Sequence, residues 1–328
     1  MEGEDVKGPE LETLGLLGGG ILNKDLYHIL KWNKKLDDLG LDTISASNTL
    51  AYAMEANERG LWNNGLKFGD IEGISKIWDD IAYRRGIGDE LAEGSKRLSE
   101  KYGGKEFAMQ SKGLELRRAV GQGLGYAVSN RGGCHLNGGY LVILEGLGLN
   151  IDAQTPHAKA DFTMMFQDLM EMISATGQCL FTSYAFFPGF LITRPNGAIA
   201  TAANKLLPHL GWAIRLMNKF PRVLAFHLPV FHHTKMMQKA VGMPMTFGKY
   251  LQTGERGFNL ERAVNVRFGV SATKDSLPKR LTDVPQDPND PRTRVPLEQM
   301  KKIYYQARGW DKSGIPTCRT LKKLKIAR

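Results

Sequence analysis

Cysteine is scarce in this chain, whose 328 residues include three: Cys134, Cys179 and Cys318. Their number is odd and their spacing is wide, so the paired cysteines of a small secreted protein are not expected. We therefore predict a reducing compartment.

Long apolar runs are also lacking. The run 184–192 is about half as long as a membrane-spanning helix, and Pro188 and Gly189 interrupt it. Residues 1–5 are mostly acidic, whereas a signal peptide begins with basic and then apolar residues. We expect a cytoplasmic protein with no membrane partner.

Acidic residues are outnumbered, because 44 Lys and Arg face 34 Asp and Glu and give a formal net charge of +10. Part of the excess lies in residues 301–328. Aromatic residues do not alternate with the basic ones as a platform for stacked bases requires. We expect no nucleic-acid partner and favour an acidic protein partner for this basic segment.

Strand-like alternation is hard to find, whereas apolar residues recur at three- and four-residue steps. A proline-rich segment, 282–296, is predicted as an exposed loop. Gly103 and Gly104 predict a boundary between helical domains at residues 1–105 and 106–328. The predicted fold class is all-α and multihelical. Helices are predicted over residues 26–40, 43–59, 69–85, 88–102, 158–175, 198–217 and 236–250 and from Leu297 onward.

Two carboxylates flank a glycine turn in the segment 37–42, which reads D-D-L-G-L-D. An ionised aspartate offers only acceptors, so Asp37 and Asp42 could both bind the N–H donors of one polar ligand. The alternative is that Asp42 caps a helix that begins near Thr43.

The same six-residue frame returns at 174–179, which reads S-A-T-G-Q-C. Glycine is again fourth, and a polar or ligating residue is first and last. Such twin turns could face two halves of one cofactor. The alternative for Cys179 is a small buried residue that binds nothing.

Together the two turns resemble D-x-x-G-L-D and D-x-x-G-L-C, the pterin-binding signature of the aldehyde ferredoxin oxidoreductase family. Further blocks that are similar to this family follow one another along nearly the whole chain. They are residues 8–13 (GPELET), 41–45 (LDTIS), 86–94 (GIGDELAEG), 112–115 (KGLE), 130–135 (NRGGCH), 262–267 (RAVNVR), 275–281 (DSLPKRL) and 304–311 (YYQARGWD).

The resemblance implies two helical domains like those of the C-terminal part of family members. It also implies tungsten or molybdenum held by two pterins beside a [4Fe–4S] cluster. Family members oxidise aldehydes to carboxylic acids, so an aldehyde substrate and ferredoxin are the implied partners. A homodimer is compatible with the sequence.

The resemblance also implies roles for individual residues. The pterins would be bound by Asp37, Gly40, Leu41, Asp42, Ser174, Gly177 and Gln178, and Cys179 would be the fourth cluster ligand.

Glu12 and His135 would line the active site, where a carboxylate or an imidazole can accept the proton that the oxidation releases. Glu10 is close enough to Glu12 to be confused with it. The alternatives are an ordinary capping glutamate for Glu12 and a structural histidine at a turn for His135. Four residues of the later blocks are instead expected to form buried hydrogen bonds: Arg262, Asn265, Arg267 and Arg280.

This sequence departs from the family in two respects. Ser174 replaces an aspartate and Gln178 replaces a leucine, which weakens the expected contact with the second pterin. The family's other cluster cysteines, a C-x-x-C-x-x-x-C run before the block at 8–13, and its N-terminal β-rich domain are absent from these residues. One cysteine cannot hold a four-iron cluster. We expect a separate chain to supply this domain, or else the chain is a remnant or a shortened form.

Three functions follow as hypotheses. The first is the C-terminal part of a tungsten- or molybdenum-pterin oxidoreductase that needs the missing N-terminal domain. The second is a non-catalytic helical binding or assembly module descended from that enzyme. The third is a family member that acts on a different substrate.

Overall fold

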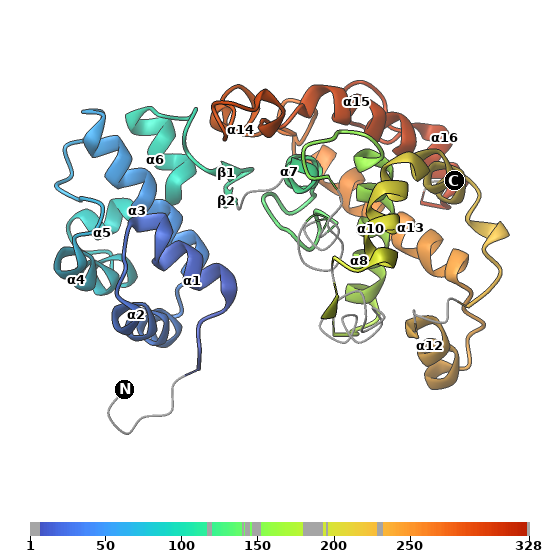
Figure 1. The fold of residues 1–328 in the computed structure, drawn as a ribbon, viewed down its shortest axis with the longest axis horizontal. Coiled ribbons are helices and arrows are strands. Elements are labelled where there is room, and N and C mark those ends of the chain that lie inside the picture. Colours follow the sequence, from blue (N-terminus) through green and yellow to red (C-terminus); the bar gives the residue numbers. More distant parts are fainter. Residues whose placement is uncertain are drawn as a thin grey trace. The chain divides into compact units, whose positions relative to one another are not determined.

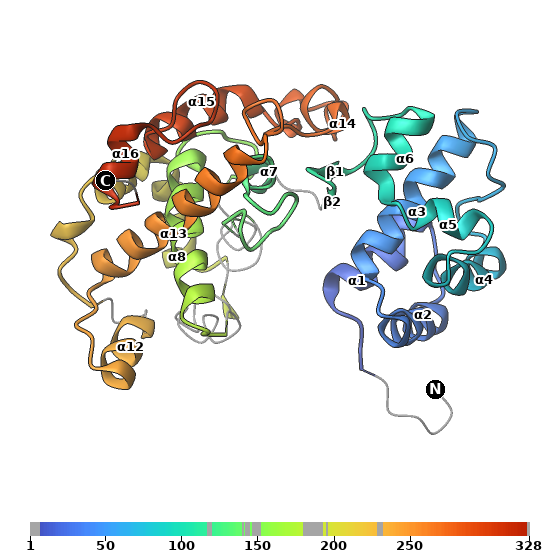
Figure 2. The same cartoon turned by 180° about the vertical axis from the view of Figure 1, so that it is seen from behind.

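The computed structural model describes residues 7–116, 120–139, 141, 145, 152–179, 193–194, 196–227 and 232–326. The chain divides into two compact units: unit 1 is Met1–Arg117 with Pro278–Arg280, and unit 2 is Arg118–Leu277 with Leu281–Arg328. Helices dominate both units (Figures 1 and 2). The predicted all-α, multihelical class is therefore confirmed. Within the ranges described, no helix combines the length and the apolar character needed to cross a bilayer.

Unit 1 buries a core of apolar side chains between its helices. Trp32 and Trp78 meet in this core with ring centroids 5.8 Å apart, and the Trp32 indole nitrogen donates to the Ser75 hydroxyl over 3.0 Å. The elements of unit 1 are α1 (Leu11–Leu17), η1 (Gly19–Ile21), α2 (Leu26–Leu39), α3 (Thr43–Glu58), α4 (Ile71–Ala82), α5 (Ile87–Leu91), α6 (Gly94–Tyr102), β1 (Gln110–Ser111) and β2 (Leu114–Glu115).

Local sequence signals explain most boundaries in unit 1. Asp25, Asp42 and Asp70 begin α2, α3 and α4, and each side chain accepts a backbone N–H of the first turn. The helix predicted over 88–102 is in fact two helices, because the backbone turns left-handed at Gly94 (φ +80°). The two strands form an antiparallel hairpin in which Gln110 lies opposite Glu115.

Unit 2 is built around two long helices, α8 and α13. The elements of unit 2, with α14 at the crossing from unit 1, are α7 (Val120–Val128), α8 (Lys159–Ala175), α10 (Ala198–Leu206), η4 (Leu207–Leu210), α11 (Gly211–Lys219), η5 (Pro221–Val223), α12 (His233–Val241), α13 (Phe247–Arg267), α14 (Lys279–Thr282), η6 (Pro291–Thr293), α15 (Leu297–Arg308) and α16 (Cys318–Lys323).

Two helix predictions in unit 2 were wrong in extent. The segment 198–217 contains a 3₁₀ turn at Leu207–Leu210, where Pro208 lies near the start of the turn. The segment 236–250 is broken after Gly242, whose φ is +67°. A new helix, α13, then begins at Phe247 and continues to Arg267.

Glycines at the crossing of α13 and α8 explain why α13 is hard to predict. A Cβ atom at Gly254 would lie 1.9 Å from the Asp168 carbonyl oxygen. A Cβ atom at Gly257 would lie 2.9 Å from the Glu171 side chain. Glycine lowers helix propensity, yet here it lets two backbones pack closely, so tertiary packing decides the structure.

A buried polar network joins α15 to α8. The Arg308 guanidinium donates to the Asp168 carboxylate over 2.5 Å and to the Gln167 side chain over 2.9 Å. It also lies 4.4 Å from the centroid of the Phe258 ring on α13. One arginine therefore holds three helices together.

A second buried pair lies at the end of α13. Arg262 donates two hydrogen bonds to Asp275, of 3.0 and 2.7 Å, and both side chains are 0% exposed. The prediction of buried hydrogen bonding is confirmed for Arg262. Arg280 is partly exposed and pairs with Glu55 inside unit 1. Arg267 is exposed, so the prediction was wrong for this residue.

We predict that Arg262→Ala lowers the free energy of unfolding by about 3–5 kcal/mol, because it leaves the Asp275 charge buried without its cation. Arg267→Ala is the matched control, since it removes an exposed arginine from the same helix and should change stability by less than about 0.5 kcal/mol. Denaturant unfolding followed by circular dichroism measures both. Equal losses in the two variants would contradict this account.

Candidate functional site

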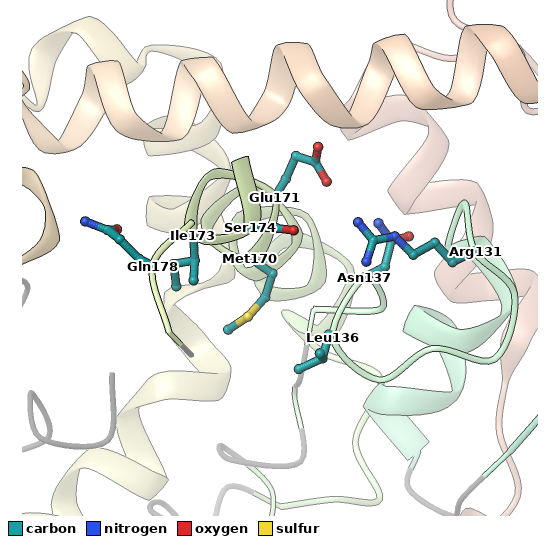
Figure 3. A pocket seen from close by; sticks show the side chains of 8 residues that line it. All are labelled: Arg131, Leu136, Asn137, Met170, Glu171, Ile173, Ser174 and Gln178. Atoms are coloured by element: carbon teal, nitrogen blue, oxygen red, sulfur yellow. The ribbon is translucent and has the colours of Figure 1, made fainter. Parts of the chain in front are cut away.

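A pocket of about 220 Å³ lies in unit 2, between the C-terminal end of α8 and the segment that follows α7. Figure 3 shows its lining side chains projecting from these two walls. They are Arg131, Leu136, Asn137, Met170, Glu171, Ile173, Ser174 and Gln178. The second predicted turn and the predicted block at 130–135 thus meet at one pocket.

The second turn follows from a left-handed glycine at the end of α8. Gly177 has a φ of +66°, and its N–H donates to the Ser174 carbonyl over 3.1 Å. The Gln178 N–H donates to the Ile173 carbonyl over 3.1 Å. This pair of bonds defines a Schellman turn, which places Ser174 and Gln178 at the pocket.

Gln178 fixes the turn to α13. Its side-chain oxygen accepts from the Tyr250 hydroxyl over 2.9 Å. Burial raises the pKa of Tyr250, so this hydroxyl stays protonated and can donate. The amide of Gln178 points away from Arg131 in Figure 3. In this structure the residue anchors the turn.

The opposite wall is also held by α13. The Asn130 side-chain amide donates to the Phe258 carbonyl over 2.9 Å, and the Asn137 amide donates to the Glu261 carboxylate over 3.3 Å. Arg131 lies 3.7 Å from the same Glu261 carboxylate. Both walls of the pocket therefore depend on one helix.

Glu171 is a charged residue of this pocket that the sequence analysis missed. Its Oε2 atom is buried and has no hydrogen-bond partner within the described part of the chain. Burial raises the pKa of its carboxyl group, the nearby Glu261 raises it further, and Arg131 opposes the shift. A signal was available, since Glu171 precedes Ser174 by one helical turn and so shares its face of α8.

The first predicted turn lies in unit 1 and has the same hydrogen bonds. Gly40 has a φ of +70°, its N–H donates to the Asp37 carbonyl over 3.1 Å, and the Leu41 N–H donates to the Leu36 carbonyl over 2.9 Å. Leu41 packs against the unit 1 core. The two six-residue frames therefore fold into equivalent turns, as their shared glycine position predicted.

The carboxylates of the first turn are both exposed. Asp42 accepts the Ser45 N–H over 2.7 Å, so the alternative that it caps α3 is confirmed. The capping bond uses Oδ1 of Asp42. The role of Asp42 as a ligand, like that of Asp37, stays a prediction.

The predicted catalytic residues are half-buried in separate units. Glu12 lies in the first turn of α1, whereas Glu10 is exposed and lies 3.6 Å from Lys7, which distinguishes the two glutamates. His135 lies directly before Leu136 of the pocket wall, and its carbonyl accepts from the Gln122 side chain over 3.3 Å. The side chain of His135 is not among the described ones that line the pocket.

Cys179 is exposed, directly after the second turn. Among the residues described, no three His, Cys, Asp or Glu side chains gather as a metal site would require. One accessible thiol fits a single position on an iron–sulfur cluster, and further ligands would have to come from elsewhere. The acceptors Glu171 and Ser174 fit the N–H edge of a ring in the pocket.

A family model described as "Aldehyde ferredoxin oxidoreductase, domains 2 & 3" matches residues 1–326. The chain is similar to the tungsten-containing aldehyde ferredoxin oxidoreductase of Thermococcus kodakarensis, at 35% identity over 94% of this chain and 47% of the relative. The enzyme of the same name from Pyrococcus furiosus is 35% identical over 98% of this chain and 49% of the relative. The chain spans about half the length of these relatives.

Two further similarities are more distant. The "Aliphatic sulfonate oxidoreductase, WOR-like subunit" of Pyrococcus furiosus is 28% identical over 39% of this chain and 23% of the relative. Among solved structures, the active site complex BamBC of benzoyl coenzyme A reductase with 1,5-dienoyl-CoA matches with a TM-score of 0.63. It is 19% identical over 99% of this chain and 50% of that chain, a likeness that concerns the fold.

We predict that Glu171→Gln stabilises the protein at neutral pH. A carboxyl group whose pKa is raised by folding does not affect stability below its pKa in the unfolded chain, about 4.3. As the pH rises from there through the folded-state pKa, ionisation of the group destabilises the folded state. Removing the charge should raise the free energy of unfolding at pH 8 by about 1 kcal/mol, the lower end for a buried group without a partner. The gain should vanish near pH 4.

Thermal unfolding at pH 8 and pH 4 checks this sign, with Glu58→Gln as the control. Glu58 is exposed at the end of α3, so its substitution should change stability little at either pH. Loss of stability in Glu171→Gln at pH 8 would contradict the prediction.

Proposed function

Because the chain belongs to the aldehyde ferredoxin oxidoreductase family, we propose that it is the helical part of a pterin oxidoreductase that converts aldehydes to carboxylic acids. The observation that carries the proposal is the pair of equivalent Schellman turns at Gly40 and Gly177, each bounded by polar or ligating residues. Equivalent turns suit a cofactor with two similar halves. The proposed metal is tungsten or molybdenum. Tungsten is favoured because the names of the relatives include it.

Most of the predicted residues have a part in this proposal. Asp37 and Asp42 accept N–H groups of one pterin, and Ser174 accepts those of the other. The left-handed glycines, Gly40 and Gly177, let the backbone approach each ring without a Cβ atom in the way. The bound metal and its pterins supply the two-electron oxidation.

Proton and electron transfer fall to other residues. Glu12 or His135 accepts the proton released when the aldehyde becomes an acid. Cys179 would hold one iron of a [4Fe–4S] cluster, which would supply electron transfer toward a ferredoxin partner. The remaining thiolates and a β-rich domain come from a partner segment or chain outside these 328 residues.

A second candidate is an oxidoreductase of the same family that acts on another substrate. The similarity to a subunit named for aliphatic sulfonates favours it, since a relative with another substrate in its name matches 39% of this chain. The turns and the pocket would then keep their roles, because they bind the cofactor. A third candidate, a non-catalytic helical module, is favoured by Ser174, which lacks the charge of an aspartate.

We predict that the isolated chain carries little or no tungsten, molybdenum or iron, because Cys179 alone cannot hold a cluster. Adding a family domain with the C-x-x-C-x-x-x-C run should restore metal binding. In that complex, Cys179→Ser should prevent cluster assembly, whereas Cys318→Ser, which alters another exposed cysteine, should not. Elemental analysis measures both metals and iron.

Two results would contradict the proposal. Stoichiometric tungsten or molybdenum with four irons in the isolated chain would show that no partner is needed. A complex in which Cys179→Ser and wild type hold equal iron would remove Cys179 from the cluster.

A further inference from the structure

The pocket beside the second turn presents acceptors and a donor on facing walls. Glu171 and Ser174 project from α8, and Arg131 projects from the segment after α7 (Figure 3). An ionised carboxylate accepts two hydrogen bonds in one plane, and a guanidinium only donates. The set is complementary to a flat ring that carries adjacent N–H donors next to a carbonyl oxygen.

The Glu171 carboxyl is not paired with Arg131. Arg131 has its ion pair with Glu261, at 3.7 Å, and no described residue bonds to Oε2 of Glu171. A buried carboxyl oxygen without a partner costs stability, so a hydrogen-bond donor that reaches it is favourable. Oε2 itself has almost no accessible surface, so a ring in the pocket reaches it when the carboxyl group turns toward the pocket.

Helix α13 holds the carboxyl in position. A Cβ atom at Gly257 would come within 2.9 Å of both Cγ and Oε1 of Glu171, so the side chain packs directly on the α13 backbone at this glycine. A side chain confined in this way loses little freedom when it binds. The stem of the side chain is therefore held in place, and only the carboxyl group has to turn.

We propose that Glu171 is the carboxylate that binds the amino and ring N–H groups of the second pterin, in place of the aspartate that Ser174 replaces. This assignment rests on the proposed function. Glu171 lies one helical turn before Ser174 and lines the same pocket. Ser174 then contributes a weaker, neutral hydrogen bond, and Arg131 donates to the ring carbonyl.

The volume of the pocket agrees with a ring edge. At about 220 Å³, it lies below the range of roughly 300–1,000 Å³ that encloses a whole drug-sized ligand. One ring edge enters, and the rest of the cofactor stays outside.

Binding of free pterins to the full chain tests the assignment without any catalytic readout. The probe is 6-hydroxymethylpterin, followed by quenching of its own fluorescence, and the comparison ligand is lumazine, which has an oxygen in place of the amino group. Wild type should bind the pterin more tightly than lumazine. Glu171→Gln should weaken pterin binding by about tenfold or more, because a charge-assisted hydrogen bond is lost.

A second variant separates loss of the carboxylate from general damage. The double variant Glu171→Gln/Ser174→Asp returns a carboxylate to the same face of α8 and should recover most of the affinity. Glu58→Gln, in unit 1, should bind as wild type does. Recovery in the double variant together with loss in Glu171→Gln supports the proposal.

The contrary outcomes are distinct. Equal affinity of wild type and Glu171→Gln overturns the role of Glu171 and leaves the proposed function standing. No pterin binding by wild type at the solubility limit of the probe overturns the assignment of this pocket. The proposed function is judged separately, by the metal content of the complex with the partner domain.

Discussion

The close contact between the backbones of α8 and α13 is the constraint on which unit 2 depends. It exists because residue 254 is glycine, since a Cβ atom there would lie 1.9 Å from the Asp168 carbonyl oxygen. The contact brings α13 against Glu171. It also lets Arg308 bind Asp168 on α8 while it stacks on the Phe258 ring of α13. Polar groups of α13, above all Glu261, then hold the opposite wall of the pocket. A displacement at Gly254 would move both walls of the pocket.

The features that the sequence predicts well are those with local causes. A left-handed residue after a helix favours glycine, so Gly40 and Gly177 could be identified as helix stops and their turns as equivalent. Capping by Asp42 is likewise a local hydrogen bond. Helix α13 has one such cause, the Thr246 side chain, which accepts the Lys249 N–H over 3.2 Å, and it fixes only the start of the helix. Its glycines lower the helix propensity of the segment. What favours the helix is packing against α8, a contact between distant residues that local sequence patterns do not predict.

The same division explains the candidate site. The six-residue frame predicts Ser174, Gln178 and Cys179 from the sequence, because a turn is formed by residues that are adjacent in the chain. Glu171 lies outside that frame, and what distinguishes it, an oxygen buried without a partner, arises only when α13 covers α8. Gln178 shows the opposite case, because a position expected at the cofactor is used to satisfy the buried hydroxyl of Tyr250.

Moving a carboxylate from the turn into the helix changes the energetics of the site. Ser174 is exposed at the last turn of α8, where a charged group would be well solvated and inexpensive to keep. Glu171 lies deeper, where burial and Glu261 disfavour its charge. A ligand that donates hydrogen bonds to this carboxylate offsets the unfavourable free energy of its burial. That offset contributes to the binding free energy. Neutral rings without N–H donors relieve nothing. A buried, poorly satisfied carboxylate therefore distinguishes ligands more sharply than an exposed one, at the cost of stability when the pocket is empty.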